Sequence, residues 1–338
     1  MKALIYTDVE VLTYMDRPMP EPQDGEALVR ITSSGICGSD MHAYLGHDAR
    51  RPAPLTLGHE AAGVIVGGPE DGRRVTINPL VACQTCNFCR TSRENLCPNR
   101  QIISMMPREG AFADYVAMPL RNLVTVPDHV TLSQAALAEP IACGWHAVRL
   151  GRAVLGGELS GMRCAVIGGG AIGVGAALSL YAQGARDITV IEPNAVRRER
   201  LADVAGFDTC APRGDGMPAD GSVNMVIDGV GYAATRETCS ALARAGGVIA
   251  HIGLGEATGG LDVRRMTLQE ITFIGTYTYT AADFEATAAA IFDGSLGALD
   301  WVEERPLSEG HRAFKDIRAG TVAAPKIILT PDHTTAGP

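Results

Sequence analysis

The sequence lacks an excess of positive charge, a long apolar run, an internal repeat and a low-complexity tract. Its formal net charge is −9, and the charged residues are spread along the chain without a basic stripe. This distribution argues against nucleic acid and against an anionic membrane as partners. No apolar run approaches the length of a membrane span, and residues 1–6 have the pattern of a strand rather than of a signal peptide. We therefore expect a soluble, cytoplasmic protein.

The length of 338 residues suits about two domains, and the pattern changes between the two halves of the chain. The first part has short β-like runs separated by Pro, Gly and Asp, which favours an irregular β-barrel; the runs cover 2–7, 27–34, 63–66 and 74–78. Residues 131–150 are expected to be helical. After them, strands alternate with helices, with strands at 163–168, 187–192, 223–228, 247–252 and 271–277 and helices at 172–183, 195–204 and 232–243. This alternation predicts a doubly wound parallel sheet.

A glycine-rich turn joins the first strand of this second part to its helix. The turn reads Gly168, Gly169, Gly170, Ala171, Ile172, Gly173, and the next strand ends in Glu192. In a dinucleotide-binding unit the first glycine permits the tight turn. The next lets the backbone approach the pyrophosphate, and the last lets helix and strand pack closely. The helix N-terminus then offers N–H groups to the phosphates. The simpler alternative is a glycine-rich strand-to-helix turn without a ligand.

Four of the nine cysteines lie within fifteen residues, a high density for a reducing compartment; they are Cys83, Cys86, Cys89 and Cys97. Four thiolates around one tetrahedral zinc ion would close a structural site and staple a segment that has little apolar core. An iron–sulfur cluster uses the same ligands and remains an alternative, as does a set of buried free thiols.

A second set of possible zinc ligands is dispersed along the chain. Cys37 follows a predicted strand, His59 precedes another, and Glu139 opens the helical stretch. Cysteine, histidine and carboxylate can leave the fourth position that a catalytic zinc needs for water or substrate. Each residue also has a simpler explanation: a small core side chain, a hydrogen-bonded loop histidine, and a charge at a helix N-terminus.

Taken together, the motifs resemble those of the zinc-dependent medium-chain alcohol and polyol dehydrogenases over essentially the whole chain. The matching segments are 35–40, 58–63, the cysteine lobe at 83–99, 110–115, 138–140 and 168–173. The resemblance implies two zinc ions per chain. Cys37, His59 and Glu139 would hold the catalytic zinc, with Glu60 close to it or an alternate ligand, and the four lobe cysteines would hold the structural zinc.

The residue at position 139 separates branches of this family. Many simple alcohol dehydrogenases have cysteine there. Sorbitol dehydrogenase, L-idonate 5-dehydrogenase and galactitol-1-phosphate 5-dehydrogenase have Glu-Pro instead, and this chain has Glu139 followed by Pro140. Cys143 lies four residues further on and is expected to serve packing. Thr278 stands where sorbitol dehydrogenases have arginine, which argues against sorbitol itself as the substrate.

The resemblance also assigns roles in proton transfer and cofactor binding. Ser39 and His42 would carry the proton released by the alcohol to water; the alternative for His42 is a surface loop histidine. Gly229 and Gly253 would line the nicotinamide side.

Glu192 should bind the ribose hydroxyls and repel a 2′-phosphate, which favours NAD. Arg197 occupies a basic family position near that ribose. Its neighbours Arg198 and Arg200 keep NADP as the alternative.

We expect a GroES-like catalytic domain of residues 1–150 plus 285–338 around a Rossmann NAD-binding domain of residues 151–284. The expected reaction is hydride transfer between NAD and a secondary alcohol of a polyol, sugar alcohol or sugar acid. The alternative is a dehydrogenase of simple alcohols, possibly with NADP. A zinc-free quinone or enoyl reductase and a non-catalytic NAD- or zinc-sensing protein are the rivals from other classes. A homodimer or homotetramer is expected through the strand at 271–279.

Overall fold

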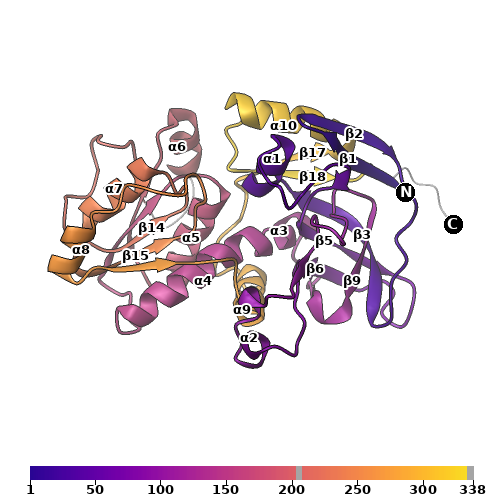
Figure 1. The fold of residues 1–338 in the computed structure, drawn as a ribbon, viewed down its shortest axis with the longest axis horizontal. Helices are drawn as coiled ribbons and strands as arrows, with labels where there is room; N and C mark the ends of the chain where they lie inside the picture. The colour runs from indigo at the N-terminus through magenta and orange to yellow at the C-terminus, as the bar shows by residue number, and fades with distance from the viewer. Residues whose placement is uncertain (203–207, 333–338) are drawn as a thin grey trace. The chain divides into compact units, whose positions relative to one another are not determined.

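The structure is a computed structural model that describes residues 1–202 and 208–332. It divides into two compact units (Figure 1). The first consists of Met1–Glu139, Thr280–Phe292 and Val302–Pro338, and the second of Pro140–Tyr279 and Asp293–Trp301. The last two residues of the helix expected at 195–204, and residues 333–338 of the expected catalytic domain, lie outside the described residues.

The first unit is mainly β-structure. Its strands are β1 (Lys2–Asp8), β2 (Val11–Asp16), β3 (Glu26–Gly35), β4 (Leu55–Thr56), β5 (Glu60–Val66), β6 (Arg74–Ile77), β7 (Leu80–Val81), β8 (Gln101–Ile102), β9 (Tyr115–Pro119), β10 (Leu123–Thr125), β17 (Val302–Pro306) and β18 (Lys326–Thr330). Its helices are α1 (Gly38–Tyr44), α2 (Asn87–Arg90), α3 (Leu132–Ala136), α9 (Ala281–Phe292) and α10 (Gly310–Ala319), with 3-10 turns at Glu94–Leu96, Leu120–Asn122 and Leu307–Glu309.

Strand β3 organises the large sheet of this unit, whose order is β10-β6-β5-β3-β18-β17 with β9 also paired to β3. The register places Gly35 opposite Glu60 of β5 and opposite Ile328 of β18. A Cβ atom built on Gly35 would lie 2.1 Å from Oε2 of Glu60, so this position needs glycine. Chain segments distant in sequence therefore bring Glu60 and the start of β18 to the end of β3.

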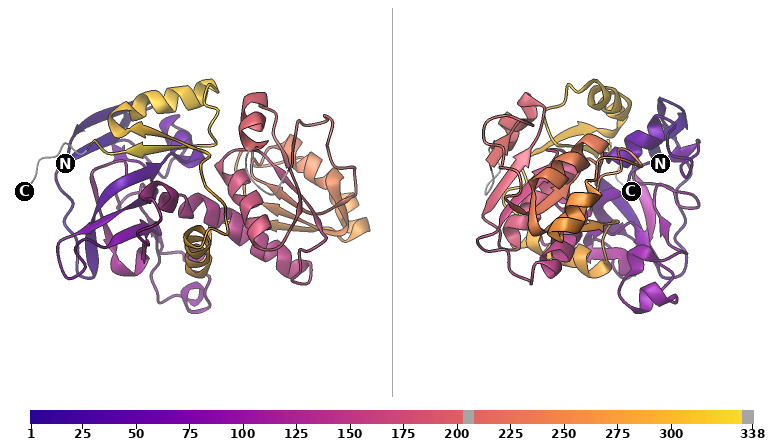
Figure 2. Two further views of the ribbon diagram at one scale, coloured as in Figure 1. Left: turned by 180° about the vertical axis from the view of Figure 1, so that it is seen from behind. Right: turned by 60° about the vertical axis from the view of Figure 1, so that its left-hand side comes forward.

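The second unit has a six-stranded parallel sheet in the order β13-β12-β11-β14-β15-β16. Its strands are β11 (Arg163–Ile167), β12 (Asp187–Ile191), β13 (Asp208–Cys210), β14 (Val223–Asp228), β15 (Ala243–His251) and β16 (Thr272–Gly275), and its helices are α4 (Ala138–Val154, which begins in the first unit), α5 (Ala171–Ala182), α6 (Ala195–Ala202), α7 (Ala233–Leu242) and α8 (Val263–Gln269). Helices flank the sheet (Figure 2).

Strand β11 is buried from Cys164 to Ile167, as expected for a parallel strand covered on both faces. It pairs with β12 on one side and β14 on the other, so the chain order reverses at this strand. The carboxyl ends of the strands at such a reversal form the usual ligand site of a doubly wound sheet. The predicted doubly wound sheet is confirmed.

The helical stretch expected over 131–150 is present, but it consists of two helices, α3 and α4, with a break at Leu137. Pro140 lies in the first turn of α4, where a missing N–H costs no helical hydrogen bond, so a new helix starts there. In the described part of the chain, no helix is both long enough and apolar enough to cross a membrane.

Candidate metal and dinucleotide sites

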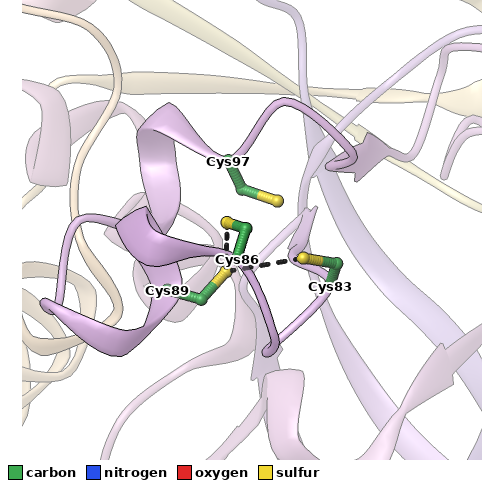
Figure 3. Close-up of side chains that lie close together, drawn as sticks. All are labelled: Cys83, Cys86, Cys89 and Cys97. Carbon is green, nitrogen blue, oxygen red and sulfur yellow. Dashed lines mark hydrogen bonds between the residues drawn. The ribbon is translucent and has the colours of Figure 1, made fainter.

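The four cysteines of the cysteine lobe point their sulfur atoms toward one another (Figure 3). All four sulfurs lie within 4.8 Å of one another; Cys86 and Cys89 are 3.5 Å apart, and Cys83 and Cys89 are 3.9 Å apart. Sulfurs bound at about 2.3 Å to one tetrahedral zinc ion would be separated by roughly 3.8 Å. The geometry of the lobe therefore fits a tetrahedral metal ion.

The protonation of these thiols is uneven without metal. The Thr85 hydroxyl donates to Sγ of Cys83 at 3.5 Å, and this hydrogen bond is the main cause that lowers the pKa of Cys83 to about 5. Burial, with help from neighbouring thiols, raises the pKa of Cys89 to about 12. A metal ion that bound all four sulfurs would displace a proton from Cys89, which would couple the stability of the lobe to metal and to pH.

A second group of ligand atoms comes from Cys37, His59 and Glu60, which also lie within 4.8 Å of one another. Cys37 immediately precedes α1, and His59 and Glu60 stand at the start of β5. Thiolate, imidazole and carboxylate are the ligand types that zinc binds in proteins, so this donor set also fits that metal.

The imidazole of His59 is fixed from its Nδ1 side. Oδ1 of Asp40 and Oγ of Ser104 each lie 3.3 Å from Nδ1, whereas Oγ of Ser39 lies 3.5 Å from Nε2. A histidine that uses one ring nitrogen for such partners presents the other to a metal. The nitrogen of His59 that could bind a metal is therefore Nε2, on the side of Ser39.

Asp40 connects the two ligand segments. Its buried carboxylate accepts the backbone N–H of Cys37 at 3.0 Å and that of Gly58 at 3.3 Å. Burial acts to raise the pKa of Asp40, but the charge and hydrogen bond of His59 outweigh it and the pKa falls. Burial likewise acts to lower the pKa of His59, but Asp40 and Cys37 raise it. Asp40 and His59 thus favour each other's charged forms.

Glu60 forms a buried ion pair with Lys326 of β18. The ammonium donates to the two carboxylate oxygens at 2.7 and 2.6 Å and to the carbonyl of Ile36 at 2.8 Å. Burial disfavours the charged amine, yet Glu60 and Cys37, with a smaller contribution from Glu139, raise the pKa of Lys326. Glu60 is thus held by a cation. Glu139 is also buried, and its charge contributes to the raised pKa of Lys326. It is not among the three residues whose ligand atoms converge.

Ser39 and His42 lie on α1 at a spacing of three residues, so they share one face of the helix. Ser39 reaches the ligand set, and His42 is exposed to solvent. The imidazole ring of His47 lies 6.3 Å from that of His42. The roles predicted for Ser39 and His42 stay predictions.

The glycine turn of the second unit has the geometry that its sequence predicts. Gly168 has a φ of +97°, and a Cβ on Gly173 would lie 1.7 Å from the carbonyl oxygen of Gly168. A Cβ on Gly170 would meet nothing within 4 Å, which leaves open space beside this residue. Helix α5 starts at Ala171, so the first N–H groups, those of Ala171 and Ile172 included, have no helical acceptor. The turn can accept a pyrophosphate.

Glu192 fixes the turn from the end of β12. Its buried carboxylate accepts the N–H of Gly169 at 2.7 Å and the N–H of Asn194 at 2.9 Å. Arg197 lies 3.6 Å from the same carboxylate. Arg198 instead donates to the carbonyl oxygen of Glu192 at 2.7 Å. Each carboxylate oxygen has a further lone pair, so Glu192 can still accept hydrogen bonds from ribose hydroxyls.

Gly229 and Gly253 follow β14 and β15 at the same edge of the sheet. The N–H of Gly229 donates to the carbonyl of Ile167, and the N–H of Gly253 to the carbonyl of Asp228, both at 3.0 Å. A Cβ on Gly253 would lie 2.1 Å from the carbonyl carbon of Val230, so only glycine fits. The buried Asp228 carboxylate accepts the N–H groups of Val230 at 2.9 Å and Gly231 at 2.8 Å.

Sequence reasoning assigned no role to Asp40, Arg51, Ser104 or Lys326. Asp40 lies inside the segment 35–40 that carries part of the family resemblance. Lys326 opens an apolar strand, and a lysine in such a place needs a buried partner. Ser104 and Arg51 carry no such signal.

Comparison with protein families gives two matches. Residues 23–128 match the model described as alcohol dehydrogenase GroES-like domain, and residues 171–293 match that described as zinc-binding dehydrogenase. The predicted combination of a GroES-like domain with a Rossmann sheet is confirmed.

Similar proteins cover nearly all of the chain. L-galactonate-5-dehydrogenase of Escherichia coli K12 is 32% identical over 88% of this chain and 89% of its own. Sorbitol dehydrogenase of Bacillus subtilis is 29% identical over 82% of both chains. Among solved structures, a zinc-binding dehydrogenase of Sinorhizobium meliloti 1021 bound to NADP has a TM-score of 0.87 and 27% identity over 98% of this chain and 99% of its own.

Proposed function

The chain belongs to the zinc-dependent medium-chain alcohol and polyol dehydrogenase family, and on that basis we propose that it transfers a hydride between NAD and a secondary alcohol. The proposed substrate is a polyol, a sugar alcohol or a sugar acid, and the product is the ketone. The observation that carries the proposal is the convergence of Cys37, His59 and Glu60 in one group of ligand atoms. The relatives that are dehydrogenases of galactonate and sorbitol support the substrate class.

Cys37, His59 and Glu139 would hold the catalytic zinc, and the cysteine lobe would hold a second, structural zinc. A zinc ion at the first set supplies a Lewis acid, which lowers the pKa of an alcohol and polarises a carbonyl. Lys326 neutralises Glu60 beside this set. Glu60 is therefore proposed to stay an alternate ligand that binds only when it leaves the lysine.

The chain's own residues would then orient the ligands and move the proton. Asp40 holds the His59 ring through Nδ1 and ties it to the Cys37 segment. Ser39, 3.5 Å from Nε2 of His59, is the proposed first acceptor of the alcohol proton. His42, exposed on the same helix face, is the proposed group that hands the proton to water.

NAD is the proposed cofactor because Glu192 stands at the end of β12 as a buried carboxylate. A 2′-phosphate beside it would meet an unfavourable charge. One such contact is worth about 1.4 kcal/mol, so kcat/KM for NAD should exceed that for NADP by about tenfold or more. Glu192→Ala should narrow the gap, and Glu199→Ala, at an exposed glutamate of α6, is the matched control. Equal or reversed efficiency of the native enzyme would favour NADP and the arginines of α6.

The substrate class is tested by initial rates with polyols, aldonic acids and simple secondary alcohols under NAD. We expect the highest kcat/KM with a polyol or sugar acid. A clear preference for simple alcohols would favour the alternative, an alcohol dehydrogenase or aldehyde reductase. Absence of turnover with all three classes, in protein that retains its metal, would favour a sensing role instead.

A homodimer or homotetramer is the proposed assembly, because β16 lies at the end of the parallel sheet, where a second copy could extend the ladder. Light scattering after gel filtration measures the state directly. The cytoplasm is the proposed location, since the cysteines are free thiols in the structure.

A further inference from the structure

Arg51 is a buried charge with defined partners. Its side chain is only 2% exposed, and a guanidinium so far from water needs an acceptor for its N–H groups. Nη1 donates to the carbonyl of Ser39 at 2.9 Å, and Nε donates to the carbonyl of Ser104 at 3.0 Å. The carboxylate of Asp48 lies 3.5 Å from Nη1. One planar group thus holds two chain segments that are distant in sequence.

Both of these segments carry a hydroxyl group that faces the same imidazole. Oγ of Ser104 lies 3.3 Å from Nδ1 of His59, and Oγ of Ser39 lies 3.5 Å from Nε2. Ser104, together with Asp40, meets the ring at Nδ1, and Ser39 meets it at Nε2. The positions of the two serines therefore limit how the ring can turn about its bond to Cβ.

Ser104 has a conformation that the chain would not adopt by itself. Its φ is +68°, and its side chain is fully buried. The left-handed region is strained for a residue other than glycine, so surrounding contacts must impose it. The hydrogen bond from Arg51 to the carbonyl of this residue is such a contact.

We propose that Arg51 is a positioning residue for the catalytic metal site. Arg51 fixes the backbone at Ser39 and Ser104 and thereby sets the orientation of the His59 ring. The inference rests on the proposed function, in which His59 is a zinc ligand. A lysine cannot replace Arg51 in this role. Its single ammonium is a point charge, whereas the guanidinium makes two hydrogen bonds in a fixed plane.

The test compares Arg51→Lys and Ser104→Ala with native protein and with Arg50→Lys. Arg50 is the matched control, because it also pairs with Asp48 but its side chain is 59% exposed. The first measurement is the visible absorption spectrum of the enzyme with Co²⁺ at the catalytic site, which reports ligand geometry without turnover. The second is the rate at which a chelator removes metal from that site, with the metal of the cysteine lobe counted separately. The third is kcat and KM.

In Arg51→Lys we expect an altered cobalt spectrum. We also expect the chelator to remove the catalytic-site metal faster, on the order of tenfold or more. Loss of a group that orients a histidine ligand typically lowers metal affinity or activity by about 10- to 100-fold, and tenfold is the lower end of that range. The kcat should fall by a similar factor while KM for the cofactor changes little. Ser104→Ala should show part of the effect, and the double variant should lose less than the product of the two, because both act on one ring. Arg50→Lys should match native protein.

Two results would separate the inference from the function on which it rests. If native protein bound no metal at the set of Cys37 and His59, the proposed function would fall, and the inference with it. If native protein bound metal there but Arg51→Lys matched Arg50→Lys in spectrum and metal release, the inference alone would fall. Should Arg51→Lys not fold, Ser104→Ala decides, because an unchanged cobalt spectrum in that variant would overturn the proposal.

Discussion

Replacing Lys326 by methionine removes the cation and keeps most of the side-chain length, so that the carboxylate of Glu60 stays buried without its partner. The side chains of Lys326 and Glu60 are 3% and 1% exposed, and all three N–H groups of the ammonium are used. Breaking a buried ion pair from one side costs about 3–5 kcal/mol. Against a total unfolding free energy of about 5–15 kcal/mol, this is a large loss.

The double variant Glu60→Gln with Lys326→Met should recover most of that loss. Neither charge is then left alone in the interior, and replacement of both members of a buried pair is often nearly neutral. Glu60→Gln alone should also cost about 3–5 kcal/mol, because it leaves the ammonium of Lys326 unpaired. With a double loss of about 1 kcal/mol, the two single losses together should exceed the double loss by about 5–9 kcal/mol.

The contribution of Lys326 to the free energy of unfolding should be fully present at neutral pH. Its pKa lies above the ordinary value of 10.5 in the folded chain, so the folded state holds the proton more tightly than the unfolded state does. A group whose pKa is raised on folding stabilises the folded state at every pH below its pKa in the unfolded chain. That stabilisation is lost only as the pH rises through its pKa in the folded chain. Measurements at pH 7 and pH 9 should therefore give the same difference between native and variant proteins.

The assay must report on the first unit. Both tryptophans, Trp145 and Trp301, belong to the second unit, so their fluorescence follows that unit. Amide hydrogen exchange in β5 and β18 reports the first unit, and urea unfolding by far-UV circular dichroism reports the whole chain. A loss below about 1 kcal/mol in Lys326→Met, or a double variant as unstable as the two single losses combined, would refute the reasoning.

Three further predictions concern the metal sites. Cys89→Ser should leave the cysteine lobe without its zinc and lower the thermal stability of the chain, because the lobe depends on metal for its folding free energy; metal analysis should fall from about two zinc ions per chain to about one, and iron in the native lobe would contradict the assignment. Glu139→Gln should lower kcat by on the order of 10² with the lobe zinc retained, since it keeps the shape but removes the ligand charge. Glu139→Cys should retain the catalytic zinc and shift preference toward simple alcohols; if Cys143→Ala abolished activity while Glu139→Gln did not, Cys143 would be the ligand.

Local patterns predicted the features whose parts are close in sequence. The glycine turn and Glu192 lie within one strand–helix–strand unit, and the four cysteines lie within one short segment, so their spacing limits how they can be arranged. Strand β17 was not predicted, because Val302–Pro306 has three charged residues and no apolar alternation. The short helix α1 was missed because it begins with glycine and spans only seven residues.

The partners of the catalytic set were beyond sequence reasoning for two physical reasons. Lys326 and Glu60 meet across 266 positions, and only the pairing of β3 with both β5 and β18 brings them together. Arg51 binds carbonyl oxygens, which every residue possesses, so no pattern of side chains identifies its acceptors.

The segmented construction of the first unit has a consequence for its synthesis on the ribosome. The large sheet of this unit has β18 beside β3, yet β18 is translated roughly 190 residues after the unit's first segment ends at Glu139. Strand β9 pairs with residues 26–30 of β3, so only the end of β3 at Ser34 and Gly35 waits for β18. At about 5–20 residues per second, this end stays unpaired on that side for roughly 10–40 s. During that interval the second unit, most of it one continuous stretch, can fold first. Until β18 pairs with that end, the nascent first segment exposes unpaired strand backbone, a feature that promotes aggregation, and slow translation before β18 would prolong the exposure.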